Sequence, residues 1–288
     1  MSEARPAVVL CRPVKRRWSS RNVALLVGGL AAAVLLAIFV AGLFSGEEAV
    51  ATSFLRKNLA PDSVHIFGTD WLGRDMLART LTGLSLSIAI GLGASTVSAF
   101  IALILGTAAA TLGGKADAVV SWAIDVAMGI PHLLLLILIS FALGKGAMGV
   151  TVAVAVSHWP TLARVIRGEI LQLKESNYVK IAEKLGHGRL RIARKHMLPH
   201  LFPQFLVGLI LLFPHAILHE AAMTFLGFGL SPEQPGIGII LSESMKYLSL
   251  GYWWLAVFPG LALLATVLLF DQLGGRVRRL IDPHSAHE

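Results

Sequence analysis

The chain has 288 residues, of which 55% are hydrophobic and only 15% are charged, and its mean hydropathy is +0.71. Soluble domains carry about a quarter charged residues, so this composition excludes an ordinary soluble protein and predicts a membrane protein. The formal net charge of +8 comes from basic residues that lie between apolar runs, which argues against a nucleic-acid-binding face and for orientation in a membrane.

Six apolar runs are long enough to cross the hydrocarbon core, which requires about 20 residues of helix. In chain order they are 23–44, a stretch within 81–114, and runs near 119–143, 148–166, 201–228 and 252–273. This pattern predicts an all-α, polytopic membrane protein with six transmembrane helices. A short interfacial helix is expected near residues 74–81, inside the long connection 45–80.

Lys and Arg gather in three segments that six spans would place on one side of the membrane. Six lie in residues 1–21, seven in residues 172–200, and three after the last run at Arg276, Arg278 and Arg279. Cytoplasmic loops carry the excess of Lys and Arg in membrane proteins. We therefore expect both termini and the 172–200 loop in the cytoplasm, with a basic cytoplasmic tail over 1–21 and a membrane domain over 22–288.

The N-terminus has an alternative interpretation as a cleavable signal peptide. A basic stretch and an apolar run precede Ala49-Val50-Ala51, which resembles a cleavage site. The run 23–44 is longer than the apolar core of a typical signal peptide, so an uncleaved first span is favoured.

Residues 176–199 form an amphipathic loop between the fourth and fifth apolar runs. Four apolar residues recur there at helical spacing: Tyr178, Ile181, Ala182 and Leu185. Gly186 and Gly188 then allow a break before a second apolar stripe, so the loop should form two short helices. Such a loop favours docking to another protein, and the alternative is a helix lying on anionic lipid.

The loop resembles the coupling loop of binding-protein-dependent ABC importer permeases. The family pattern is Glu-Ala-Ala, three residues, a Gly and a downstream Leu-Pro, and it is matched here by Ala182, Gly186, Leu198 and Pro199. Lys180 and Ile181 depart from the usual Glu-Ala, which puts a contact from the first pattern position in doubt.

Three further blocks resemble one branch of that family, the C-type permease of dipeptide, oligopeptide and nickel importers. Residues 67–75 read Phe-Gly-Thr-Asp-Trp-Leu-Gly-Arg-Asp, and residues 224–229 read Thr-Phe-Leu-Gly-Phe-Gly. Residues 258–262 read Phe-Pro-Gly-Leu-Ala, and residues 280–283 end the pattern with Leu-Ile-Asp-Pro. These blocks occur in the family's order between residues 65 and 284.

The resemblance implies a type I ABC importer permease fold in the bacterial inner membrane. Such a chain forms half of a translocation pathway, and its loop 172–200 couples to two cytoplasmic ABC ATPase subunits. The other implied partners are a homologous second permease, an extracytoplasmic substrate-binding protein and membrane lipid, with no nucleic acid.

The chain has no G-x-x-x-x-G-K-[ST] phosphate loop, so we expect it to be no enzyme and to bind no cofactor itself. ATP and Mg²⁺ would belong to the partner ATPases. A membrane enzyme and a self-sufficient secondary transporter are the competing classes. An enzyme would need converging nucleophile and base groups, for which the histidines in the spans are the only candidates, and the docking loop and six spans argue against a secondary transporter.

Histidines favour nickel or a metal chelate as cargo, with dipeptides or oligopeptides as the alternative. His215 and His219 lie one turn apart on one helix face, and we group them with His158 and Glu220 as candidate pathway residues. Neutral imidazole binds nickel well, so His215 and His219 are the candidate metal ligands. The alternative is polar packing between helices. The tail residues His284 and His287 are expected to be solvated.

The charge distribution makes a topological prediction. A cysteine introduced at Ser176 should not react with a membrane-impermeant thiol reagent added outside intact cells, because the surrounding basic loop is retained in the cytoplasm. It should react once the membrane is permeabilised. Labelling from outside would overturn the orientation.

Overall fold

The computed structural model describes residues 20–281. Nearly all of the predicted basic tail, together with His284 and His287, therefore lies outside the described residues. The first half of the described chain contains α1 (Ser20–Phe44), α2 (Gly46–Val50), the 3₁₀ turn η1 (Phe54–Arg56), α3 (Met76–Leu112), α4 (Gly114–Gly129) and α5 (His132–Ala142). The second half contains α6 (Gly146–Ser157), α7 (Trp159–Lys174), α8 (Asn177–Lys184), α9 (Arg189–Ile192), the π-helical turn η2 (Ala193–Met197), α10 (Leu198–Phe225), α11 (Ile237–Leu248) and α12 (Trp254–Ile281).

The prediction of an all-α, multi-span protein is confirmed, and the third span is sharply bent. Five helical stretches are long and apolar enough to cross a membrane: Arg21–Phe44, Met76–Leu112, Gly146–Lys174, Leu190–Phe225 and Trp254–Ile281. The sixth candidate is the pair α4 and α5, which meet at an angle of 97°. The proline within the run 119–143 predicts a kink in this span, and the structure shows the break at Ile130 and Pro131, because proline has no N–H to continue the hydrogen-bonding pattern of α4.

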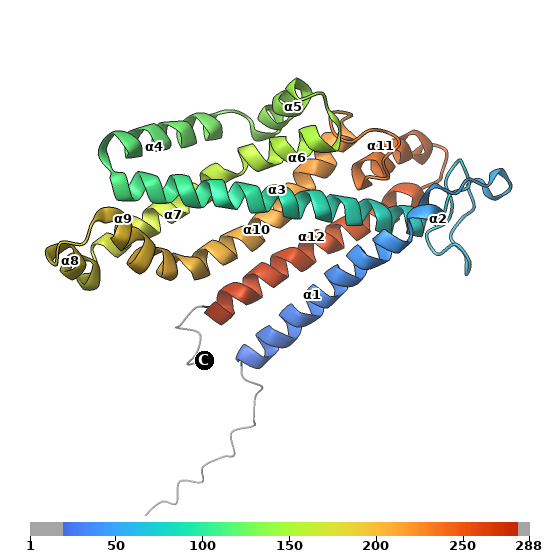
Figure 1. Cartoon of the computed structure of the whole chain (residues 1–288). Coiled ribbons are helices and arrows are strands. Elements are labelled where there is room, and N and C mark those ends of the chain that lie inside the picture. Colours follow the sequence, from blue (N-terminus) through green and yellow to red (C-terminus); the bar gives the residue numbers. More distant parts are fainter. Residues whose placement is uncertain (1–19, 282–288) are drawn as a thin grey trace, which may run out of the picture.

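The long helix α3 lies at the centre of the bundle and packs against α1, α6, α7 and α10. The helices α1 and α12 run side by side along one edge (Figure 1). The start of α1 and the end of α12 point toward the end of the molecule that carries α8 and α9, and the 51–75 connection lies at the opposite end (Figure 1). This arrangement places the described ends of the chain and the amphipathic loop on the same side.

Two glycines in α3 allow close helix packing. A Cβ atom at Gly106 would lie 2.7 Å from the carbonyl oxygen of Ala163 on α7, and one at Gly91 would lie 2.7 Å from Ile217 on α10. Small residues let membrane helices approach closely, and the packing of these helices gains dispersion energy from that approach. The central helix is thus held directly against α7, which begins directly after His158, and against α10, which carries His219.

The 51–75 connection ends in a helix cap rather than in a separate helix. The Asp75 carboxylate accepts a hydrogen bond of 2.9 Å from the backbone N–H of Ala78, which is the usual N-cap interaction. It also pairs with the His65 ring at 2.8 Å. The prediction of a short interfacial helix near residues 74–81 is wrong, because Asp75 caps a helix that continues without a break to Leu112.

The block 67–75 folds around the fully buried carboxylate of Asp70. That carboxylate accepts backbone hydrogen bonds from Leu72 and Arg74 at 2.8 and 2.9 Å. The guanidinium groups of Arg74 and Arg79 approach it to 2.6 and 2.8 Å, and Arg79 also reaches Glu243 on α11 at 2.9 Å. This charge network ties the connection to the start of α3 and to α11.

The network predicts an unequal cost for two acid-to-alanine substitutions. Asp70→Ala leaves buried guanidinium and backbone N–H groups without their partner, so the free energy of unfolding should fall by about 3–5 kcal/mol. Asp125→Ala removes an acid that is 70% exposed in its pair with Arg164 and should cost less than about 1 kcal/mol. Denaturant unfolding of the purified protein in detergent measures both. Equal losses would contradict the structural role of Asp70.

Candidate functional site

Three spanning segments are interrupted or weakened at one place in the bundle. The bend between α4 and α5 falls at Ile130 and Pro131. The helices α6 and α7 meet at His158, directly before Trp159. Inside α10 stands Pro214, which removes a helical N–H donor. Irregular backbone at membrane depth is tolerated where it is buried in protein or lines a cavity.

A cavity of about 610 Å³ lies where these segments meet. This volume falls within the range of small-molecule sites, about 300–1,000 Å³. Apolar side chains such as Met128 and Leu212 form part of the wall. The polar side chains of the lining are His132, Ser157, His158, Thr161, His215 and His219. Four of these six are histidines, which gives the cavity its chemical character.

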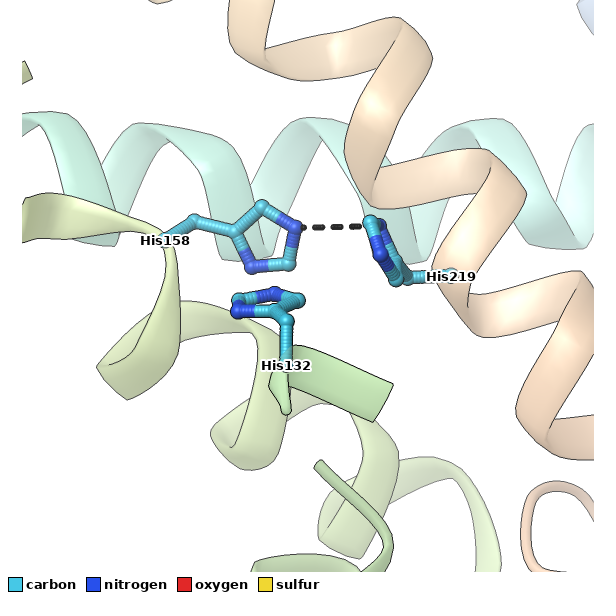
Figure 2. A group of neighbouring side chains, drawn as sticks. All are labelled: His132, His158 and His219. Carbon is cyan, nitrogen blue, oxygen red and sulfur yellow. Dashed lines mark hydrogen bonds between the residues drawn. The ribbon is translucent and has the colours of Figure 1, made fainter. Parts of the chain in front are cut away.

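Three of the histidines converge from three different segments (Figure 2). His132 begins α5, His158 joins α6 to α7, and His219 lies on α10. Their ring centroids are 4.6, 4.7 and 5.1 Å apart, and the rings stand edge to face. Nε2 of His158 lies 3.4 Å from Nδ1 of His219. We call these three residues the histidine cluster.

Backbone carbonyls fix two rings of the histidine cluster. Nδ1 of His158 lies 3.0 Å from the carbonyl oxygen of Val154, and Nδ1 of His219 lies 2.7 Å from that of His215. The ring of His132 has a buried Nε2 without a hydrogen-bond partner among the described residues. His158 is buried, whereas His132 and His219 are half-buried. The cluster therefore combines fixed ring orientations with at least one unsatisfied nitrogen.

The structure places the predicted pathway residues in two environments. His158, His215 and His219 line the cavity, but the cluster is completed by His132 and not by His215. Glu220 does not line the cavity. Its fully buried carboxylate instead accepts hydrogen bonds from Ser87 on α3 at 2.5 Å and from Thr224 at 2.9 Å. Glu220 therefore links α10 to α3 in this conformation.

His132 was missed from the sequence, although a signal was present. The stretch Gly129-Ile130-Pro131 directly before it interrupts an otherwise helical run, and glycine and proline mark such breaks. The residue after a break between spans is where a side chain can enter a cavity. Treating 119–143 as one continuous span hid that position.

The chain matches a known protein family over most of its length. Residues 102–284 match the family described as the binding-protein-dependent transport system inner membrane component. The chain belongs to this family. It is therefore an inner-membrane, multi-pass permease subunit of an ABC importer, and not the ATPase.

Relatives of the permease come from peptide transport systems. It is 32% identical to the dipeptide transport system permease protein DppC of Bacillus subtilis, over 98% of this chain and 88% of that protein. It is 36% identical to a putative peptide transport system permease protein of Brucella suis, over 96% of this chain and 92% of that protein. With the oligopeptide permease protein OppC of Bacillus subtilis it shares 34% identity, over 87% of this chain and 81% of that protein.

A solved structure shares the fold of the permease. A chain of the methionine ABC transporter MetNI, captured in inward-facing conformations, superimposes with a TM-score of 0.58 at 19% identity. The match covers 72% of this chain and 98% of that chain. The prediction of an ABC importer permease fold is confirmed.

The predicted loop of the permease forms two short helical segments, α8 and the α9–η2 turn, as expected. The side chain of Ala182 is buried among core residues that include Ile170 on α7 and Met197 on η2. Gly186 separates the segments with a φ of +80°, and Leu198 and Pro199 begin α10. The Lys180 ammonium, 2.8 Å from Glu175, holds the pKa of that exposed carboxyl below its usual value. The loop is thus a packed unit joined to the spans at both ends.

Proposed function

We propose that the permease forms half of the translocation pathway of a peptide importer, with dipeptides or oligopeptides as cargo. The observation that carries this proposal is the near full-length similarity to permeases named for dipeptide and oligopeptide transport. The sequence alone favoured nickel over peptide. The relatives support the peptide alternative better, because they match over the whole membrane domain, whereas the histidine pattern concerns a few side chains.

The cavity is the candidate segment of the pathway within this subunit. Its volume of about 610 Å³ suits a small molecule, and it lies at the helix breaks, where spans can change their relative angles. A homologous second permease would supply the facing half, and an extracytoplasmic binding protein would deliver the cargo. ATP and Mg²⁺ would be bound by two ATPase partners, so this chain would need no cofactor of its own.

Coupling to the ATPases is assigned to the loop 172–200, with Ala182, Gly186, Leu198 and Pro199 as its pattern residues. Three features support this role. The loop projects from one end of the bundle (Figure 1). Its side chains enter the core cluster that also contains residues of α3, α7 and α10. The Lys174 ammonium donates a hydrogen bond to the carbonyl oxygen of Ala110 at the end of α3. A displacement of the loop would therefore be transmitted to the spans.

We infer the orientation of the permease in the membrane from the same end of the bundle. The described ends of the chain lie at its end of the bundle (Figure 1). Basic residues are concentrated there, at Arg276, Arg278 and Arg279 as well as in 172–200. The positive-inside rule then assigns this end to the cytoplasm.

Cargo identity can be tested by transport. The permease, its second permease, the ATPases and the binding protein are reconstituted into proteoliposomes, and uptake of a labelled dipeptide is compared with uptake of ⁶³Ni²⁺. We expect ATP-dependent uptake of the dipeptide. Proteoliposomes without ATP serve as the control. Uptake of free ⁶³Ni²⁺ with no dipeptide uptake would reject the peptide proposal.

The coupling role predicts the effect of Gly186→Val. At a φ of +80° a residue with a Cβ atom is strained by roughly 1–2 kcal/mol, so the hinge between α8 and α9 should change conformation. We expect transport to fall severalfold while the protein still assembles in the membrane.

The matched control is Gly188→Val, two residues away, where φ is ordinary and no atom lies within 4 Å of an added Cβ. Both variants are measured by ATPase stimulation and dipeptide uptake. Normal coupling in Gly186→Val, or an equal loss in Gly188→Val, would count against the hinge.

A further inference from the structure

We propose that His132, His158 and His219 form a binding site for a late first-row divalent metal ion, presented to the translocation cavity. One ring nitrogen of each histidine lies within 4.8 Å of the others. An ion equidistant from three nitrogens at that upper bound would lie about 2.8 Å from each, whereas a Zn–N bond is about 2.0–2.1 Å. Each nitrogen then has to move inward by less than about 1 Å, which side-chain rotation supplies.

The hydrogen bonds of the cluster leave lone pairs available for a metal. An N–H on Nδ1 of His158 donates to the carbonyl oxygen of Val154, so Nε2 carries the lone pair, which faces Nδ1 of His219 at 3.4 Å. In His219 the same donation from Nδ1 to the carbonyl of His215 leaves Nε2 free. Metal-binding histidines usually donate their other ring N–H to a carbonyl, carboxylate or water. Two of the three rings already have such a partner.

His132 supplies an independent observation. Its Nε2 is buried and lacks a hydrogen-bond partner within residues 20–281. A buried polar group without a partner costs free energy, about 1–3 kcal/mol, unless something outside the chain satisfies it. Packing alone gives no reason for that cost. A metal ion bound at Nε2 would remove it.

The donor set selects the class of ion. Three neutral imidazoles without a carboxylate suit Ni²⁺, Cu²⁺ or Zn²⁺, and they disfavour Mg²⁺ and Ca²⁺, which prefer oxygen ligands. The nearest candidate acid along α10, Glu220, is directed to Ser87 and Thr224 and does not enter the cavity. The site therefore adds no negative charge that would hold the ion permanently.

Three protein ligands leave coordination positions open toward the cavity. Those positions would be filled either by water, for a free ion, or by nitrogen and oxygen atoms of a chelating ligand such as a peptide. This inference deepens the proposed function, on which it rests for the role of the cavity as pathway: the cargo would include metal-bound ligands. The metal site itself can be tested without transport.

The test uses the complete transporter in lipid nanodiscs. Co²⁺ is titrated into wild type, and its visible d–d absorption reports nitrogen coordination, with Ni²⁺ competing for the same site. We expect a saturable Co²⁺ spectrum that is displaced by Ni²⁺ and unaffected by Mg²⁺. Single variants His132→Ala, His158→Ala and His219→Ala should each weaken Co²⁺ binding by about tenfold or more, since even the loss of an outer partner costs 10–100-fold.

Two control variants separate the cluster from other histidines. His200→Ala removes an exposed ring beside Tyr178 that does not line the cavity, and it should bind Co²⁺ as wild type does. His215→Ala removes a cavity ring outside the cluster but keeps the backbone carbonyl that bonds to His219, so Co²⁺ binding should also persist. Loss of binding in His215→Ala with retention in His132→Ala would overturn the assignment of the three ligands.

Assembly with the partner subunits serves as the check that each variant is folded. His132 and His219 are only half-buried, so their variants carry the test if His158→Ala does not assemble. The metal site would be rejected if wild type gave no Co²⁺ spectrum, or if all three variants assembled and bound Co²⁺ as wild type does. The three rings would then only pack against one another. Ni²⁺ alone and Ni²⁺ premixed with a histidine-containing dipeptide, titrated in parallel, distinguish a free ion from a chelate. Failure of dipeptide uptake would reject the proposed function and leave these binding results standing.

Discussion

The structure depends on one constraint, which is that backbone N–H and C=O groups in a membrane must be satisfied within the protein. A span can therefore be interrupted only where other helices or a cavity protect the exposed groups. Here the break at Pro131, the junction at His158 and Pro214 within α10 lie at or next to one cavity. Interruptions placed separately would each need their own protection. Placed together, they share one cavity, in whose largely apolar wall four histidines provide most of the polar side chains.

Polar contacts tie both ends of the bundle to the long helix α3. At one end Asp70 gathers two guanidinium groups and two backbone N–H groups, which fixes the long connection over the start of α3. At the other end the loop between α7 and α10 buries apolar side chains such as Ala182 in the core and bonds to the end of α3 through Lys174. Because α3 contacts both ends and packs against α6, α7 and α10, which supply cavity residues, it is the element through which the proposed movement of the loop would reach the proposed pathway.

Hydropathy was sufficient to predict the all-α membrane fold and five of the six spans, because each is a long run without compensating charge. Hydropathy does not show the bend at Pro131, since the flanking residues are equally apolar on both sides, but the proline itself predicts a kink there, without its angle. Periodicity placed His215 and His219 on one face correctly, but it carries no information on which distant segment brings its own histidine to that face. His132 therefore stayed hidden. Glu220 was expected to line the pathway because it is an acid at membrane depth. In the structure it accepts a hydrogen bond from Ser87, which lies 133 positions away in the chain, so sequence spacing gave no sign of this contact.

Peptide cargo and a metal-binding cavity are compatible in chemical terms. A peptide carries an amino group, amide groups and a carboxylate, so it can itself chelate a late transition-metal ion, and a histidine side chain adds a nitrogen ligand of the kind such ions prefer. The cluster of His132, His158 and His219 offers neutral nitrogen donors and no acid, which suits an ion that arrives with part of its coordination sphere already filled. A complete cage of four or more protein ligands would retain the ion. An incomplete one allows the cargo to enter with its metal and to leave with it when the spans change angle, which is the property that a pathway requires and a storage site lacks.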